Sequence, residues 1–315
     1  MSAPTWSGRV DGDGPEHLRV HQHVTTGDDV RPGEAIALVG FASDAGVRRN
    51  HGRPGAADGP RALRAALGPL ALHPGDDGAV RTIVDLGDVT VTGDELEAGQ
   101  DALGDLVARA LTDHGRAVVL GGGHETAWGS YLGRTRVEAL EGRRVGVVNL
   151  DAHFDLRRAE RPSSGTPFLQ MAQADEAAGR AFRYLVAGIS RASNTKVLFD
   201  EAARLGTEVV LDVDCQPRHL DRLLETVDAY VAELDAVHLS IDLDLLPAAV
   251  APGVSAPAGY GVPMEVVDAV AAHLAASGKL VLADVVELCP RLDVDGRTAR
   301  AAARLIHTLG SHWRA

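Results

Sequence analysis

The feature that most constrains the fold is a set of eight short apolar segments, each ending in a Gly- or Asp-rich turn and followed by a helical pattern. The segments are rich in Val, Ile and Leu and do not alternate polar with apolar residues, which is typical of strands covered on both faces. Repeated alternation of strand and helix indicates a parallel sheet between two helix layers. We therefore predict strands in 35–41, 81–88, 116–123, 143–153, 183–190, 207–214, 236–244 and 279–288.

Residues 94–114 carry the clearest helical pattern between these strands, because apolar residues recur on one face. Thr92 and Glu95 stand at the spacing of a capping box, and Gly115 follows as a C-terminal cap. The apolar pattern alone does not distinguish an open sheet from a closed barrel. We expect an open sheet, because polar clusters follow three of the strands, where ligands bind in such sheets.

No Pro/Ser-rich linker, charge block or internal repeat interrupts residues 35–310, so we predict one domain over 35–315 and an N-terminal extension over 1–34. A formal net charge of −13 argues against a nucleic-acid or anionic-membrane partner. The sequence has no signal-peptide core and no apolar run near the ~18 residues of a membrane span. Its two cysteines form no disulfide framework. We expect a cytoplasmic protein.

Three polar clusters at the predicted strand ends concentrate the residues that could perform chemistry. They are GGGHE (121–125), NLDAHFDLR (149–157) and SIDLDLLP (240–247). Three glycines allow a sharp turn in the first cluster. In the second, Asp151, His153 and Asp155 alternate with apolar residues, so an extended backbone would point all three side chains to one side. In the third, Asp242 and Asp244 share a face in the same way.

Together the clusters predict a metal centre. Alone, a Gly-rich turn or an Asp-x-Asp sequence is usually an ordinary connection or cap. The Asp-x-His-x-Asp run is harder to explain that way, because three unpaired ionisable groups at one edge would repel each other and lose solvation. Two divalent cations would balance four carboxylates, and a ligand set without thiolate favours Mn²⁺ over Zn²⁺. The predicted ligands are His124, Asp151, His153, Asp155, Asp242 and Asp244.

In this order and spacing, the three clusters resemble the metal motifs of the ureohydrolases, the arginase and agmatinase family, over roughly residues 35–310. The resemblance implies a three-layer α/β/α fold with a mostly parallel eight-stranded sheet, two Mn²⁺ per subunit, and assembly into trimers or hexamers. It also implies hydrolysis at an amidine or guanidine carbon. By position, one ion would be bound by His124 and Asp155, the other by His153 and Asp244, and both by Asp151 and Asp242.

Two residues are expected to act on the substrate directly. The segment ADVVELCP (283–290) resembles the family segment whose Glu, here Glu287, faces the C–N head of the substrate. Asp155, as a metal ligand that touches the nucleophile, is predicted to pass a proton to the leaving amine. In arginases and agmatinases a His is proposed to shuttle protons, and Ser164 stands at that position here.

The departures from arginase, at Gly123, Glu125 and Ser164, resemble the formimidoylglutamases. These enzymes hydrolyse N-formimidoyl-L-glutamate to L-glutamate and formamide in histidine degradation. Four more segments share the resemblance, at 46–67, 124–133, 188–195 and 251–263. A substrate with two carboxylates needs donor groups, and Arg presents a planar fork suited to them. We predict that Arg157, Ser164 and Arg191 bind the substrate.

Other functions stay open on the sequence. The closest is another amidinohydrolase, such as a guanidino-acid hydrolase, an agmatinase or an arginase-like enzyme. From another class, the chain could be a metal-binding regulatory protein or an inactive partner subunit, although all six ligand positions carry competent residues. A two-metal phosphoesterase is disfavoured, because the sequence shows no nest or basic clamp clearly aimed at phosphate. The expected partner is a small dicarboxylate amidine, with no nucleic acid and no membrane.

Overall fold

The computed structural model describes residues 6–26, 35–74 and 80–314. Its strands form one parallel sheet in the order β1-β3-β2-β4-β9-β8-β5-β6-β7. The strands are β1 (Val24–Thr25), β2 (Ala35–Ala42), β3 (Thr82–Thr90), β4 (Ala117–Leu120), β5 (Val145–Leu150), β6 (Tyr184–Ile189), β7 (Glu208–Leu211), β8 (Ala236–Asp242) and β9 (Leu280–Val286).

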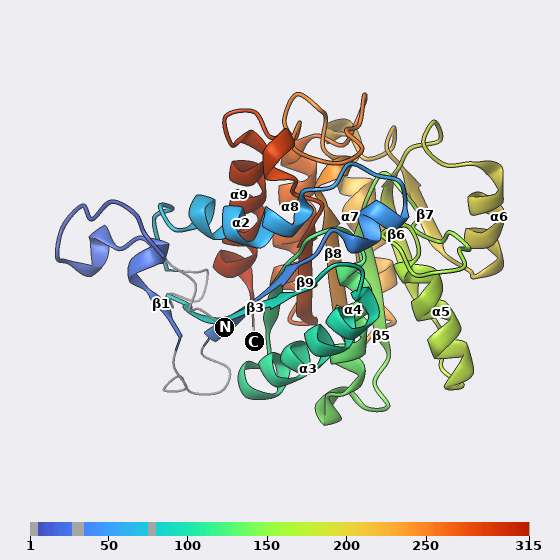
Figure 1. Ribbon diagram of the computed structural model, residues 1–315, viewed down its shortest axis with the longest axis horizontal. Helices are drawn as coiled ribbons and strands as arrows, with labels where there is room; N and C mark the ends of the chain where they lie inside the picture. Colours follow the sequence, from blue (N-terminus) through green and yellow to red (C-terminus); the bar gives the residue numbers. More distant parts are fainter. Residues whose placement is uncertain (1–5, 27–34, 75–79, 315) are drawn as a thin grey trace.

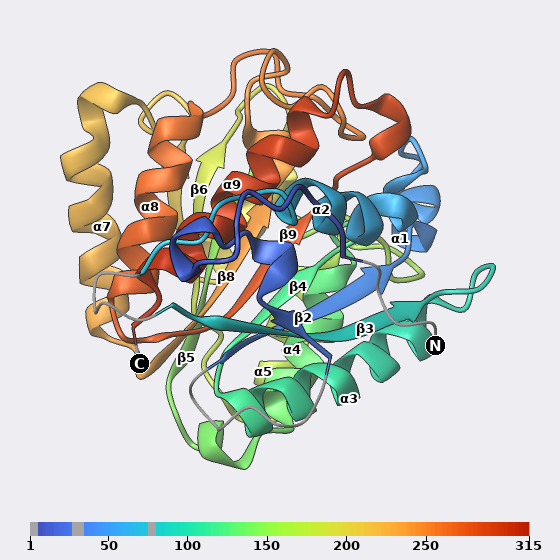
Figure 2. The same cartoon turned by 90° about the vertical axis from the view of Figure 1, so that its left-hand side faces the viewer.

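Helices cover both faces of this sheet (Figures 1 and 2). Helices α3 to α6 pack on one face, and α2, α7, α8 and α9 pack on the other. Their bounds are α1 (Ala45–Arg49), α2 (Gly59–Leu67), α3 (Leu96–His114), α4 (Thr126–Thr135), α5 (Pro167–Ala177), α6 (Lys196–Arg204), α7 (Leu220–Ala232), α8 (Met264–Ala276) and α9 (Arg297–His312). No helix in the described residues is long and apolar enough to cross a membrane.

The predicted three-layer α/β/α architecture with an open parallel sheet is confirmed. Eight of the strands correspond to the eight apolar segments that were predicted as strands, although β2 and β3 end one and two residues later than predicted. The ninth is β1, which comes from the predicted N-terminal extension and pairs with β3 at one edge of the sheet. The described sheet therefore has nine strands, one more than the family resemblance implies.

Burial on both faces explains the continuous apolar character of the strands. In β4, Val118 and Leu120 pack into the apolar cluster beneath α2 and α9, whereas Ala117 and Val119 pack into the cluster beneath α3. All four side chains are buried. A strand with helices on both sides has no solvent-facing position, so its sequence does not alternate.

The start of α3 differs from the prediction. The helix begins at Leu96, and its N-terminal cap residue, Glu95, makes no capping hydrogen bond with its side chain. The backbone N–H of Glu95 donates instead to the carbonyl of Thr92, 3.2 Å away. The expected capping box is therefore wrong, because a backbone turn satisfies the group that the side chain would have capped. Gly115 does end the helix in the left-handed conformation, with φ of 74°.

The described part of the N-terminal segment packs against the domain. Val20 is buried in the core, and the Trp6 indole N–H donates to Asp85 Oδ2 at 2.8 Å. The same carboxylate accepts two hydrogen bonds from the guanidinium of Arg64, at 2.7 and 2.8 Å. Residues 6–26 therefore belong to the packed structure, and Arg64 and Asp85 form a buried ion pair that ties α2 to β3.

Replacing Arg64 with Met should destabilise the protein by about 3–5 kcal/mol, because Asp85 would stay buried without its cation. The control is Arg144→Met, which breaks the ion pair with the exposed Asp235 and should cost less than about 1 kcal/mol. Urea unfolding of both variants measures the difference. Similar losses in the two variants would contradict a structural role for the buried pair.

Candidate metal centre

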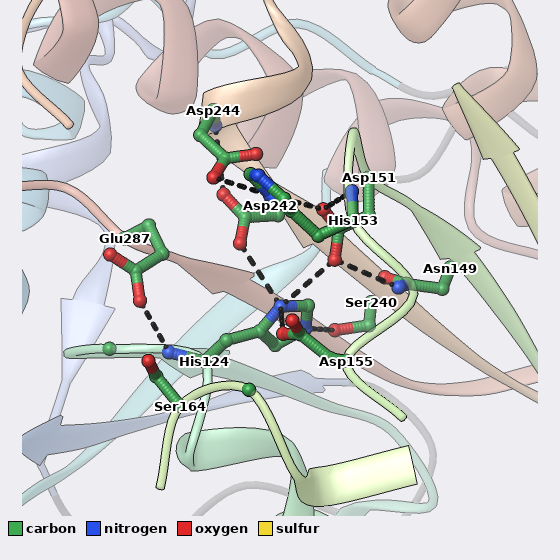
Figure 3. Close-up of polar contacts among 12 residues, drawn as sticks. His124, Asn149, Asp151, His153, Asp155, Ser164, Ser240, Asp242, Asp244 and Glu287 are labelled. Carbon is green, nitrogen blue, oxygen red and sulfur yellow. Dashed lines mark hydrogen bonds and ion pairs between the residues drawn. The ribbon is translucent and has the colours of Figure 1, made fainter. Parts of the chain in front are cut away.

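Four neighbouring strands end at one edge of the sheet and bring the predicted ligands together. His124 follows β4, Asp151 follows β5, Asp242 is the last residue of β8, and Glu287 follows β9. In the sheet these strands lie in the order β4-β9-β8-β5, so segments far apart in the sequence become neighbours. Figure 3 shows their side chains converging on one centre.

The first candidate ligand set surrounds the His124 ring. Its Nδ1 atom lies 3.0 Å from Asp155 Oδ2, 3.0 Å from Asp242 Oδ2 and 3.1 Å from Asp151 Oδ2. The ring nitrogen is buried and makes no well-formed hydrogen bond with a described residue. One ring nitrogen carries at most one proton and cannot satisfy three carboxylate oxygens. A cation placed between these four groups would satisfy all of them, so the residues fit a metal ion.

A second set overlaps the first. His153 Nδ1 lies 3.1 Å from Asp244 Oδ2 and 3.6 Å from Asp151 Oδ1. Candidate ligand atoms within each set lie within 4.8 Å of one another, and Asp151 belongs to both sets. The structure thus brings all six predicted ligands together and places Asp151 in both candidate sets. Asp242 groups with the first set only, so its contact with both ions stays a prediction.

The three glycines before His124 lie where the chain bends after β4, as predicted, and they also allow close packing there. None of them has a positive φ. A Cβ atom on Gly122 would lie 1.8 Å from the carbonyl oxygen of Ser43, which is backbone and cannot rotate away. The N–H of Gly123 donates to the same oxygen at 3.0 Å. Glycine is required here because the chain carrying His124 passes directly against the chain after β2.

The alternation of Asp151, His153 and Asp155 is confirmed, but the backbone that produces it is not extended throughout. The intervening Ala152 and Phe154 are buried among apolar residues, as the alternation requires. Asp155, however, has φ of 48°, in the left-handed region that non-glycine residues rarely adopt. Such conformations persist where the surrounding structure enforces them, and they cluster at functional sites.

Asp242 and Asp244 come together through a turn and not along one strand face. Strand β8 ends at Asp242, and Asp244 lies in the short 3₁₀ helix Leu243–Leu245. The Asp242 carboxylate caps this turn by accepting a hydrogen bond from the Asp244 N–H at 2.8 Å. The predicted strand was therefore too long, because the cap turns the chain before Asp244.

Two residues that orient the ligands were missed in the sequence. Asn149 Nδ2 donates to Asp151 Oδ2 at 3.0 Å, and Ser240 Oγ lies 3.0 Å from His124 Nε2. The contact with Ser240 engages Nε2 and leaves Nδ1 of His124 for a metal ion. Ser240 stands two positions before Asp242 on β8, and Asn149 stands on β5 two positions before Asp151, which directly follows that strand. The two-residue period of a strand was the signal that could have found them.

Electrostatics in this centre favour a cation. Burial, followed by the charges of Asp244 and Asp151, raises the pKa of Asp242 well above its usual range. Burial also raises the pKa of Asp244 to about 6, although His153 opposes the shift. The nearby Asp244 charge in turn raises the pKa of His153 to about 12. Without a metal ion the centre retains protons, so metal binding must release them.

Comparison with known proteins agrees with this geometry. Residues 34–310 match the sequence profile of the arginase family. The chain is 53% identical over 308 residues to the formimidoylglutamase of Nocardia farcinica, covering 98% of this chain and 96% of that protein. It is 52% identical to the formimidoylglutamase of Rhodococcus jostii, covering 97% and 94% of the two chains. This chain belongs to the arginase family.

Solved structures share the fold of this arginase-family chain. Trypanosoma cruzi formiminoglutamase with Mn²⁺ superposes with a TM-score of 0.80 at 23% identity, covering 94% of this chain and 98% of that one. Formimidoylglutamase from Bacillus subtilis gives a TM-score of 0.80 at 21% identity, covering 93% and 91%. At these identities the likeness concerns the fold alone.

Glu287 lies beside the metal-ligand sets but belongs to neither. Its Oε1 accepts a hydrogen bond from the His124 N–H at 2.8 Å, and its own N–H donates to the Gly122 carbonyl at 2.7 Å. Its φ is 70°, so it is a second non-glycine residue in the left-handed region at this edge. Burial raises the pKa of Glu287, and the charges of Asp242 and Glu125 raise it further.

The predicted substrate residues lie around this centre at different depths. Ser164 is buried, and its Oγ accepts a hydrogen bond from Asn50 Nδ2 at 3.1 Å. Figure 3 shows it below the His124 backbone, on the side of Glu287. Arg157 is exposed and makes no ion pair with a described residue. Arg191 is also exposed, and its guanidinium lies over an aromatic ring, 5.2 Å from the centroid of Phe199.

Metal stoichiometry tests the assignment of the ligands. In Asp151→Asn, both ions should be lost, because Asp151 supplies an oxygen to each ligand set. In His153→Asn, one ion should remain, because the set around His124 is intact. In Asp242→Asn, the loss of both ions would identify a second bridging ligand, and the loss of one would place Asp242 in the first set alone. Metal analysis after gel filtration gives the ratios.

The control for these variants is Asp200→Asn, whose carboxylate pairs with Lys196 on the surface. It should bind as much manganese as the unmodified protein. Two ions per chain in Asp151→Asn would contradict the shared position of this residue.

Proposed function

We propose that this protein is a formimidoylglutamase, which hydrolyses N-formimidoyl-L-glutamate to L-glutamate and formamide in histidine degradation. The single observation that carries this proposal within the structure is the pair of overlapping ligand sets that share Asp151. Sequence identity above 50% over nearly the whole chain to formimidoylglutamases supports the same substrate. Residues 35–315 would form the catalytic domain, with 1–34 as an N-terminal extension.

The proposed cofactor is a pair of Mn²⁺ ions. Four carboxylates and two imidazoles without thiolate suit this ion, and the Trypanosoma cruzi formiminoglutamase structure contains Mn²⁺. Two such ions supply, when bound, a water molecule that is nucleophilic near neutral pH. The residues that would hold them are His124 and Asp155 at one ion, His153 and Asp244 at the other, and Asp151 and Asp242 between them.

Asp155 and Glu287 would divide the work of moving protons and orienting the substrate. Asp155 offers one carboxylate oxygen to the ligand set around His124. Its other oxygen could therefore carry a proton from the attacking water to the leaving amine. The His124 N–H donates a hydrogen bond to Glu287 Oε1 and fixes the position of this carboxylate. In that position Glu287 would hold the protonated imine nitrogen of the substrate. The formimidoyl carbon carries only one hydrogen, so attack is little hindered.

Ser164 occupies the position of the proton-shuttling His of arginases and agmatinases. Asn50 donates a hydrogen bond to its hydroxyl. Unlike an imidazole, a serine hydroxyl does not titrate near neutral pH, so it is unsuited to take up a proton from solvent. We therefore assign Ser164 to substrate contact and leave proton transfer to Asp155. The leaving amine of glutamate is basic and takes up a proton readily, so a dedicated shuttle is not needed to expel it.

Arg157 and Arg191 are the proposed groups for the two substrate carboxylates. Arg157 stands two residues after Asp155, and no described carboxylate pairs with it. Its guanidinium is therefore available to bind a carboxylate in a bidentate manner. Arg191 lies in the loop after β6, and its guanidinium packs over the ring of Phe199 in α6. This contact restricts the position of the guanidinium. A guanidine substrate without carboxylates, such as agmatine, would leave both cations unused.

A substrate panel tests the proposed function. With Mn²⁺ present, formimidoylglutamate should be hydrolysed with release of formamide, because the substrate carboxylates match the arginines described above. Arginine, agmatine and guanidinobutyrate should release urea at least about a hundredfold more slowly, since each lacks one or both carboxylate contacts. Faster release of urea from any of them would assign the chain to another amidinohydrolase. Bound manganese without any turnover would favour a regulatory role.

Arg157→Gln tests the carboxylate contact. Loss of a charge-assisted bidentate interaction should raise KM for formimidoylglutamate about 10–100-fold and change kcat little, because the contact is remote from the reacting carbon. The control is Arg158→Gln at the adjacent position. The guanidinium of Arg158 already pairs with Glu201, so this substitution should not change KM. Steady-state kinetics measure both. An unchanged KM in Arg157→Gln would remove this residue from the substrate site.

A further inference from the structure

A cleft with a volume of about 760 Å³ opens at the edge of the sheet opposite to the metal centre. Its walls come from the end of α4, the segment before β5 and the segment before β6. All strands are parallel, so the amino ends of β5 and β6 lie at the edge opposite to the one that carries the metal ligands. The arginines that line it are Arg134, Arg136, Arg143, Arg144, Arg180 and Arg183.

Arg134 is the unusual residue in this cleft, because it is a buried cation without a counter-ion. It is only 6% exposed, and its Nε atom is inaccessible and has no hydrogen-bond partner among the described residues. Its guanidinium carbon lies 4.7 Å from the centre of the Tyr131 ring, and no ion pair with a described residue accompanies this contact. Arg keeps its charge in proteins, and an unpaired buried charge is costly.

The nearest carboxylate does not compensate for this charge. Asp175 already accepts hydrogen bonds from Tyr131 Oη at 2.7 Å and from Arg180 Nε at 2.9 Å. Arg183, on the same wall, donates only to the carbonyl of Ala181 at 3.3 Å. Asp175 therefore faces more than one guanidinium group, and the inner part of the cleft, around Arg134, keeps a positive charge. The other two carboxylates that line the cleft, those of Glu138 and Glu141, are exposed and make no ion pair with a described residue.

The remaining arginines divide into paired and unpaired groups. Arg136 pairs with Asp101 and Asp105, and Arg144 pairs with Asp235. Arg143 is exposed and makes no ion pair with a described residue. The lining arginines that make no ion pair with a described residue are thus the buried Arg134, the half-buried Arg183 and the exposed Arg143. The carboxylates of Glu138 and Glu141 are exposed, so the buried guanidinium of Arg134 is the charge that lacks a partner inside the cleft.

We propose that this cleft is a binding site for a small oxyanion that carries phosphate or carboxylate groups. Arg134 anchors the anion from below, and Arg183 and Arg143 contact it from the rim. Planar guanidinium groups bind both kinds of oxyanion in a bidentate manner, which explains the use of arginine. Strand β5 spans six residues, or about 20 Å, between this cleft and Asp151. The ligand is therefore separate from the substrate undergoing hydrolysis.

Isothermal titration of the manganese-loaded protein with inorganic phosphate, and separately with succinate, tests the proposal at constant ionic strength. At least one anion should bind saturably with a Kd of roughly 1 mM or tighter. Arg134→Met, which retains much of the apolar stem and removes the charge, should weaken binding at least about tenfold. The control is Arg136→Met in the same cleft, which should change Kd less than about threefold because Arg136 is already paired.

The outcomes separate the two sources of the anion and the two sites. Binding of phosphate alone indicates a phosphate-bearing ligand, and binding of succinate alone indicates a carboxylate ligand. Binding that persists unchanged in Arg134→Met belongs to the metal centre and overturns the proposal, as does the absence of saturable binding of either anion. If Arg134→Met fails to fold, Arg183→Met replaces it, because removing the guanidinium of this half-buried residue should weaken the same binding.

Discussion

Four carboxylates and two imidazoles gathered at one buried edge of an apolar sheet determine what the rest of this structure must do. Mutual repulsion and lost hydration oppose such a cluster, and they raise the pKa of Asp242 and of Asp244. Two divalent cations would remove the excess charge and would give Nδ1 of His124 a partner that three carboxylate oxygens cannot provide. Without a metal ion the cluster therefore destabilises the folded protein, and metal binding would stabilise the folded state.

The strand order makes this arrangement possible. Strands β8 and β9 come last in the sequence but enter the sheet between β4 and β5, so that four consecutive strand ends supply the centre. Helices on both faces bury these strands and fix their positions, while the candidate ligands stand at the strand ends or shortly after them. Asp155 and Glu287, the two proposed reacting groups, both adopt positive φ. Such backbone strain persists where the surrounding structure enforces the conformation, and it clusters at functional sites.

Much of the fold and of the metal centre could be predicted from local sequence patterns. Continuous apolar segments identified eight strands, because these strands are buried on both faces. The alternation in Asp151–His153–Asp155 identified three candidate ligands, because it follows the two-residue period of an extended chain. The strand order could not be predicted, because nothing in the sequence of β8 or β9 states which neighbour it pairs with. The turn that carries Asp244 and the left-handed Asp155 depend on that tertiary context. Asn149 and Ser240 could have been predicted, since each stands two residues before a candidate ligand at the end of a strand.

Charge pairing distinguishes the structural ionic groups of this chain from those that face a ligand. In the described interior, Arg64 pairs with Asp85, and His238 pairs with Asp284, 2.7 Å away on the neighbouring strand. These pairs lie within the packed layers, where no ligand can reach them and each charge must be satisfied internally. Uncompensated charge occurs at the two edges of the sheet, negative at the metal centre and positive around Arg134. A fold that pairs its inaccessible charges has no structural reason to leave Arg134 without a counter-ion. The same reasoning that places cations between the carboxylates therefore places an anion against this arginine.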